Sequence, residues 1–147
     1  MKVTDRIKQE HDEVTKLFEQ FEKRPTMKLV KQIKEVLDPH HYAEEETVFA
    51  DVAKKSEQKA ELVRNLKAEH EAIDLLFEDI FLMKVSDEMF EPKVYVLHEV
   101  IDHHLKEEEE VFFKHAEEVY SDAKLSSVTK DFDQAKSAYT PSKDEAN

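Results

Sequence analysis

The chain has 147 residues and a formal net charge of −13 at pH 7, and it contains no cysteine. This length predicts one domain with a sizeable core, and the lack of cysteine excludes disulfides, thiolate metal sites and cysteine nucleophiles. The negative charge argues against nucleic acid and anionic membranes as partners, because their phosphate groups would be repelled.

The composition predicts an all-α protein. Glycine and tryptophan are absent, and only four prolines interrupt long stretches of helix-favouring residues. The charged N-terminus lacks the apolar core of a signal peptide, and no segment has the ~20 apolar residues of a membrane span. We therefore expect a cytoplasmic protein.

Amphipathic patterns predict the first two helices. The first spans about residues 3–23, and Thr4 or Asp5 is expected to cap it. The second spans about residues 27–55. Its interior contains Pro39, which removes a backbone donor and is expected to kink the helix just before a pair of histidines.

Three further helices are predicted in the rest of the chain. The third is capped by Ser56 and runs to about residue 84, and the fourth begins near Pro92 and ends near residue 121. A shorter amphipathic segment, about residues 125–139, is expected to pack as a fifth helix. Residues 140–147 are expected to form a disordered tail.

Single histidines occur on the apolar faces of the first and third predicted helices. His11 and His70 each have apolar neighbours at helical spacing, and the sequences around them match one another. These neighbours are Ile7, Val14 and Phe18 in the first helix and Leu66, Ile73 and Phe77 in the third.

A longer motif occurs in the second and fourth predicted helices. Residues 40–49 align without a gap with residues 103–112. In each copy a histidine on the apolar face precedes a glutamate by one helical turn, as His41 precedes Glu45 and His104 precedes Glu108. Side chains at this spacing project side by side from one face. The chain is therefore a doubled unit of one histidine followed by a histidine–glutamate pair.

The predicted turns place these six side chains at one level. In an up-down-up-down bundle, residues at the same level are equally distant from the turn that joins their helices. The midpoint of His11 and His41 is residue 26, and that of His70 and His104 is residue 87. The midpoint between residue 43, the centre of the His41/Glu45 pair, and His70 lies between residues 56 and 57. Each midpoint lies in a turn that was predicted independently, so we expect one layer.

Four imidazoles and two carboxylates in a core predict a metal site. A buried carboxylate costs several kcal/mol unless a cation or hydrogen bonds compensate for it. Imidazole and carboxylate ligands without thiolate suit iron, manganese, cobalt or zinc. Core histidines that bind no metal are the alternative, and they would leave the carboxylates poorly compensated.

The doubled motif resembles that of the hemerythrin family, specifically its HHE cation-binding domains. The resemblance covers about residues 3–120 and implies an up-down-up-down four-helix bundle within one domain of residues 1–139. It also implies a di-iron centre with a bridging oxo or hydroxo group, with manganese or zinc as alternatives. The ligands that it implies are His11 and His41 for one iron, His70 and His104 for the other, and Glu45 and Glu108 as bridges.

The chain departs from the oxygen-carrying hemerythrins at two positions. Glu108 has the same spacing as Glu45, where those proteins have an aspartate one residue later. Asp74 stands where they have a fifth histidine, and it either ligates a metal or accepts a hydrogen bond. We therefore expect a four-histidine site, with His40 and His103 as outer groups.

The function that the resemblance implies is that of a non-haem di-iron protein that binds or reacts with dioxygen, peroxide or nitric oxide. Binding or sensing on one hand and peroxide decomposition on the other are alternatives, because no general acid or base can be told from the ligands. A helical sensor or adaptor with a structural, redox-silent metal is a separate alternative. The sequence identifies no protein partner.

Overall fold

The computed structural model describes residues 1–141, and every regular element in this part of the chain is a helix. The predicted all-α class is therefore confirmed. Of the predicted tail 140–147, residues 142–147 lie outside the described residues. None of the described helices combines the length and the apolar character that crossing a membrane requires.

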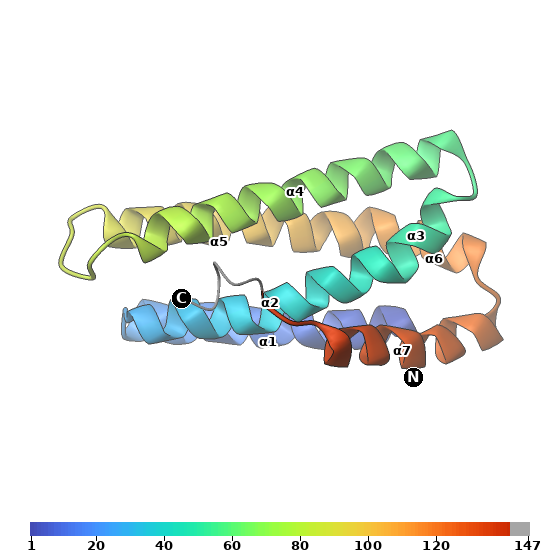
Figure 1. Cartoon of the computed structure of the whole chain (residues 1–147), viewed down its shortest axis with the longest axis horizontal. Helices are drawn as coiled ribbons and strands as arrows, with labels where there is room; N and C mark the ends of the chain where they lie inside the picture. Colours follow the sequence, from blue (N-terminus) through green and yellow to red (C-terminus); the bar gives the residue numbers. More distant parts are fainter. Residues whose placement is uncertain (142–147) are drawn as a thin grey trace.

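The first two helices begin close to their predicted positions. α1 spans Val3–Lys23, and α2 begins at Met27 (Figure 1). α1 starts before both residues expected to cap it, so Asp5 instead places a negative charge in the first turn, near the positive end of the helix dipole. At the start of α2, the Thr26 hydroxyl accepts a hydrogen bond from the Leu29 amide at 3.2 Å.

The predicted extent of the second helix, about residues 27–55, is wrong, because the helix ends within the histidine–glutamate motif of residues 40–49. α2 spans Met27–Glu46, and the short helix α3 spans Val48–Ala53. Thr47 separates them with φ −120° and ψ −90°, outside the helical region. Its hydroxyl donates a hydrogen bond to the Ala43 carbonyl at 2.6 Å. Such back-bonding competes with the helical hydrogen bonds and bends helices.

The third and fourth predicted helices begin where expected. α4 spans Glu57–Phe81, and its cap Ser56 accepts a hydrogen bond from the Lys59 amide at 3.2 Å. α5 spans Phe90–Glu107 and contains Pro92 in its first turn, where the missing amide hydrogen has no helical partner to lose.

The fourth predicted helix changes its winding at the second copy of the motif. Residues Glu108–Phe112 form a π-helical turn, η1, before the helix continues as α6 (Phe113–Val119). Such turns are rare and frequently lie at functional sites. The predicted fifth helix is present as α7, Asp122–Ala138.

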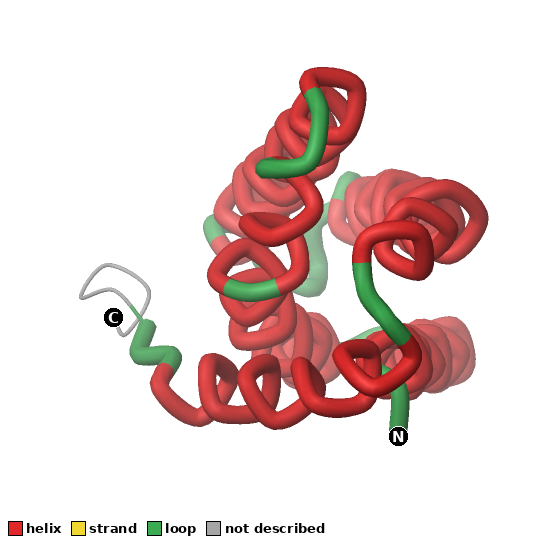
Figure 2. The backbone as a smooth tube through the Cα atoms, turned by 90° about the vertical axis from the view of Figure 1, so that its right-hand side faces the viewer, coloured by secondary structure: helices red, strands yellow, loops and turns green. Residues whose placement is uncertain are grey.

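The helices pack in pairs. α1 packs against α2 and α4 packs against α5, while α3 lies beside α4 at one end of the molecule (Figure 1). α7 packs against both α2 and α1, and in the end-on view the helix that leads to the C-terminal end lies across the lower side of the molecule (Figure 2). The first helical pair is therefore covered by an additional helix.

The apolar core consists of two clusters with polar residues between them. In α1, Ile7 belongs to one cluster and Val14 to the other, and the buried His11 stands between them in sequence. The same succession occurs around His70 in α4. The buried polar side chains thus occupy one layer, as the turn midpoints predict.

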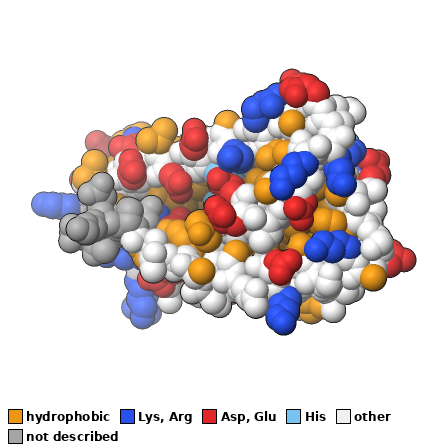
Figure 3. All heavy atoms as spheres, turned by 45° about the vertical axis from the view of Figure 1, so that its right-hand side comes forward, with side chains coloured by type: hydrophobic (Ala, Val, Ile, Leu, Met, Phe, Trp, Pro, Cys, Tyr) orange, Lys and Arg blue, Asp and Glu red, His pale blue; other side chains and the backbone are white. Residues whose placement is uncertain are grey.

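Charged side chains of both signs are interspersed on the face that Figure 3 shows. Although the chain has a net charge of −13, the acidic side chains on this face do not gather into one patch. The negative charge therefore identifies no docking site on this face.

Candidate metal centre

Buried histidines and glutamates form two groups of four residues, and in each group the candidate ligand atoms lie within 4.8 Å of one another. All members of both groups are buried. Glu44 belongs to both groups, so its carboxylate lies between them. The three-histidine group consists of His41, His70, His104 and Glu44; the two-histidine group consists of His11, His40, Glu44 and Glu108.

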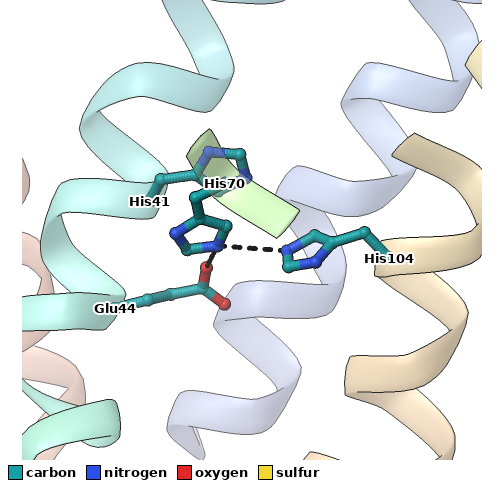
Figure 4. A group of neighbouring side chains, drawn as sticks. All are labelled: His41, Glu44, His70 and His104. Atoms are coloured by element: carbon teal, nitrogen blue, oxygen red, sulfur yellow. Dashed lines mark hydrogen bonds and ion pairs between the residues drawn. The ribbon is translucent and has the colours of Figure 1, made fainter. Parts of the chain in front are cut away.

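The three-histidine group brings imidazoles from three helices onto one carboxylate (Figure 4). His70 Nε2 lies 3.1 Å from His104 Nε2 and 3.4 Å from Glu44 Oε1. The ring of His41 stacks on that of His70, with the ring centroids 3.7 Å apart. Two Nε2 atoms and a carboxylate oxygen therefore converge on one small volume, which is the arrangement that a bound cation requires.

The two-histidine group is more acidic. His11 Nε2 lies 2.9 Å from Glu108 Oε1, and His40 Nε2 lies 3.4 Å from Glu44 Oε2. The group thus offers two nitrogen and two carboxylate ligands, whereas the other offers three nitrogens and one carboxylate. The site as a whole is asymmetric in both donor type and charge.

Seven buried side-chain atoms have no hydrogen-bond partner within the described chain, and all of them belong to these two groups. Buried polar atoms in proteins are almost always paired, since an unpaired one costs roughly 1–3 kcal/mol and a charged one more. A pair of cations would satisfy these atoms, so the residues present fit a dinuclear metal site. The atoms are Nε2 of His11, His40 and His41 and both carboxylate oxygens of Glu44 and Glu108.

Outer carboxylates orient four of the five imidazoles. In each case Nδ1 donates to a glutamate, which leaves Nε2 directed to the interior of the site. Such carboxylate–histidine pairs fix the ring and its tautomer in metal sites. The pairs are His11–Glu109 at 2.7 Å, His40–Glu10 at 2.9 Å, His70–Glu45 at 2.8 Å and His104–Glu69 at 2.7 Å.

The two inner glutamates have opposite pKa shifts. Burial raises the pKa of Glu44 well above its usual range, and the neighbouring Glu108 carboxylate raises it further. Burial acts in the same direction on Glu108, but the adjacent Glu44 carboxyl group and the His11 ring outweigh it and hold the Glu108 pKa well below its usual range. The opposite shifts are those expected of two neighbouring carboxylates, of which one resists ionisation while the other is charged.

The inner histidines also differ in their pKa. Burial lowers the pKa of His41 well below its usual value, and the surrounding imidazoles lower it further. Burial acts in the same direction on His11 and His70, but the carboxylates around them outweigh it and raise their pKa. Protons and cations therefore compete for the ring nitrogens of His11 and His70.

The structure brings together five of the six predicted ligands. His11, His41, His70, His104 and Glu108 all lie in the two groups, whereas Glu45 and Asp74 lie in neither.

Glu44 takes the inner position that the sequence assigns to Glu45. Glu45 accepts a hydrogen bond from the outer nitrogen of His70, and its side chain is 34% exposed. The physical reason is the orientation of α2 about its axis, which buries both His40 and His41. Glu44 follows His40 by one helical turn, so its side chain lies on the same buried face.

The structure also differs from the four-histidine site expected from the sequence. His40 is fully buried and belongs to the two-histidine group, so five imidazoles line the site. A signal for His40 and Glu44 exists in the sequence, because both continue the apolar stripe of Ile33 and Leu37 at helical spacing. The equivalent His103, in contrast, has a side chain that is 70% exposed.

The π-helical turn lets two consecutive glutamates reach one histidine. Glu108 lies 2.9 Å from Nε2 of His11, and Glu109 accepts a hydrogen bond from Nδ1 of the same ring at 2.7 Å. Both belong to η1, where the backbone is wound more widely than in an α-helix. The local winding therefore supplies both the inner and the outer carboxylate of His11.

Comparison with known protein families gives one informative match. The family model described as Hemerythrin HHE cation binding domain matches residues 2–116, which include α1 to α5, η1 and every residue of the two groups. No curated protein and no solved structure matched the chain in the corresponding comparisons. The match covers most of the chain, and the chain therefore belongs to the hemerythrin HHE cation-binding domain family.

Proposed function

We propose that the protein holds a carboxylate-bridged pair of iron ions and uses it to bind or react with dioxygen, peroxide or nitric oxide. The observation that carries this proposal is the position of Glu44, whose two unpaired oxygen atoms face one histidine group each. One carboxylate shared in this way is the arrangement of a dinuclear metal site. The proposed scaffold is an up-down-up-down bundle made by α1, α2 with α3, α4, and α5 with α6.

In this proposal Glu44 replaces Glu45 as a bridging ligand. The two-histidine group supplies His11, His40 and Glu108 to one ion, and the three-histidine group supplies its three imidazoles to the other. Glu45, Glu10, Glu69 and Glu109 hold the outer ring nitrogens. Asp74 is half-buried outside both groups, and we assign it no ligand role.

The donors of the two groups fit iron. Mixed imidazole and carboxylate ligands suit iron, manganese and zinc, and four donor residues leave an octahedral ion with open positions. Iron supplies redox chemistry with small oxygen and nitrogen ligands when it is bound. The two groups differ in their number of carboxylates, so they would offer two bound ions different charge environments.

The surroundings of the site favour a small ligand. Phe49 stacks on His70, and Phe112 packs against Phe49, so apolar rings adjoin the three-histidine group. Two described surface hollows, one over α7 and one beside Tyr120, include no residue of either group in their linings. Dioxygen, peroxide and nitric oxide need no large cavity, which is consistent with this enclosed environment.

Metal analysis combined with an absorption spectrum tests the proposal. Metal-free protein is loaded with iron(II) without air, desalted, analysed for metal and then exposed to air or peroxide. We expect two iron ions per chain and a new ligand-to-iron charge-transfer absorption after exposure. One tightly bound zinc ion with no spectral response to any oxidant would contradict the proposal and favour a structural metal.

A further inference from the structure

α7 lies outside the residues that match the family model, yet it reaches the two-histidine group. The match ends at residue 116, whereas α7 spans Asp122–Ala138. Phe132 of α7 is fully buried, and its ring and that of His40 form a T-shaped contact with the ring centroids 5.8 Å apart. The helix therefore contacts a candidate ligand directly.

A chain of polar contacts also joins α7 to His40. Glu10 Oε1 accepts the hydrogen bond from His40 Nδ1 at 2.9 Å, and the other oxygen of the same carboxylate accepts a hydrogen bond from Lys136 of α7. Arg6 lies farther away, 4.0 Å from this second oxygen, and pairs more closely with Asp133 at 3.0 Å. The Glu10 carboxylate is therefore held between a candidate ligand and a lysine.

Glu10 differs from the other outer carboxylates in its burial. Its side chain is 6% exposed, whereas those of Glu45, Glu69 and Glu109 are 27–34% exposed. The exposed three can be compensated by solvent, but a carboxylate as deep as Glu10 needs a cation from the protein.

We propose that Lys136 is a positioning residue for the two-histidine group. By holding the Glu10 carboxylate in place, it keeps Nδ1 of His40 engaged and Nε2 directed at Glu44. α7 then sets the metal affinity of the two-histidine group and leaves the three-histidine group unaffected. The inference rests on the proposed function in one respect, namely that both groups hold metal.

The test compares Lys136→Met with a matched control on the same helix. Lys130 is exposed, so Lys130→Met removes the same charge without touching Glu10. Metal-free proteins are titrated with cobalt(II) and iron(II) without air, and the affinity of each equivalent is measured. Loss of such outer partners typically weakens a metal site about 10–100-fold. In Lys136→Met we expect this loss of affinity for one of the two metal equivalents. Lys130→Met should keep both affinities, and Lys136→Arg should recover part of the lost affinity.

A second readout needs no metal. The Nδ1 proton of His40 in metal-free protein is followed by nitrogen-15 NMR, and its exchange with water is measured. We expect slow exchange in the wild type and in Lys130→Met, and fast exchange in Lys136→Met. Unchanged helicity by circular dichroism in all three proteins would separate positioning from general unfolding.

The outcomes distinguish this inference from the proposed function. Wild-type affinities for both equivalents in Lys136→Met would overturn the inference alone, and so would an equal weakening of both. If the wild type itself failed to bind two metals, the proposed function would be overturned. In that case the His40 proton still decides whether Lys136 positions the ring: slow exchange in Lys136→Met would refute that role, and fast exchange would support it.

Discussion

The two copies of the histidine–glutamate motif have the same letters at key positions and different roles. In α2, His40 and His41 are both buried and the first glutamate of the run, Glu44, faces inward. In the second copy only the second histidine is buried, and the inward glutamate, Glu108, aligns with Glu45. The inner pairs thus have the same one-turn spacing in both copies, but they are displaced by one residue.

The difference follows from what covers each helix. α7 packs against α2 and places Phe132 beside His40, so the face that carries this histidine is buried. The face of α5 that carries His103 is open, and the His103 side chain is 70% exposed. The surroundings therefore decide whether the first histidine of an identical pair is buried. An asymmetric site results from a nearly symmetric sequence.

The largest effects on metal binding are expected at Glu44 and Glu45. Glu44→Ala removes the carboxylate that belongs to both groups, and we expect loss of tight binding at both. Glu45→Ala removes only an outer hydrogen bond to His70 and should weaken one equivalent by about 10–100-fold. Metal equivalents per chain measure both effects, with the exposed Glu46→Ala as control. A greater loss from Glu45→Ala than from Glu44→Ala would reverse their roles.

The aligned histidines provide the next test. His40→Ala removes a donor from the two-histidine group, so we expect that group to lose most of its affinity while the other still binds. His103→Ala alters an exposed ring outside both groups and should change neither affinity measurably. Metal titration of the two variants measures these affinities. Equal losses of affinity in His40→Ala and His103→Ala would show that the two copies of the motif have equivalent roles.

The buried ionisable groups of the site should differ in their response to pH. In the metal-free fold the pKa values of Glu44, His11 and His70 are raised, so their stabilising contributions are present at low pH and are lost as pH rises through the folded pKa values. His41, with a lowered pKa, contributes above its unfolded value of about 6.5 and less below it.

Because three groups with a raised pKa act in one direction and His41 alone acts in the other, we expect the metal-free protein to melt at a lower temperature at about pH 8 than at about pH 6. The metal-loaded protein should show the opposite trend, because acid displaces the metal from its ligands. Calorimetry of both forms across this range checks the signs. Parallel trends in the two forms would mean that protons and metal do not compete for these groups.

The smallest effect is expected at Asp74. This residue is half-buried and lies in neither group, so Asp74→Asn should retain two metal equivalents with wild-type affinities. The same metal titration measures the equivalents and affinities of Asp74→Asn. Loss of an equivalent would make Asp74 a ligand, as the fifth-histidine position of the resembling oxygen carriers suggests.

Much of the fold could be predicted because its signals are local. The apolar stripes, Ser56 as a cap and Pro92 in a first turn all act within a few residues of themselves, and the structure bears them out. The single layer of polar residues also follows from helix lengths and turns. The break at Thr47 and the π-helical turn at Glu108 depend on tertiary packing and on small backbone changes, which periodicity does not reveal.

The site was harder to predict because helical periodicity has limited angular resolution. Adjacent residues such as His40 and His41, or Glu44 and Glu45, differ by one position on the helix, and both can border a broad buried face. The deciding factor for His40 is α7, which lies far along the chain and joins it through Glu10 and Lys136. A pattern confined to one helix does not contain that contact.

The central claim is that Glu44 bridges two metal ions. A crystal structure of the iron-loaded protein, with anomalous maps recorded at the iron edge, tests it most directly. The account predicts two anomalous peaks, one at each histidine group, with the Glu44 carboxylate between them. A single peak, or two peaks joined by Glu45 with Glu44 directed away, would contradict it.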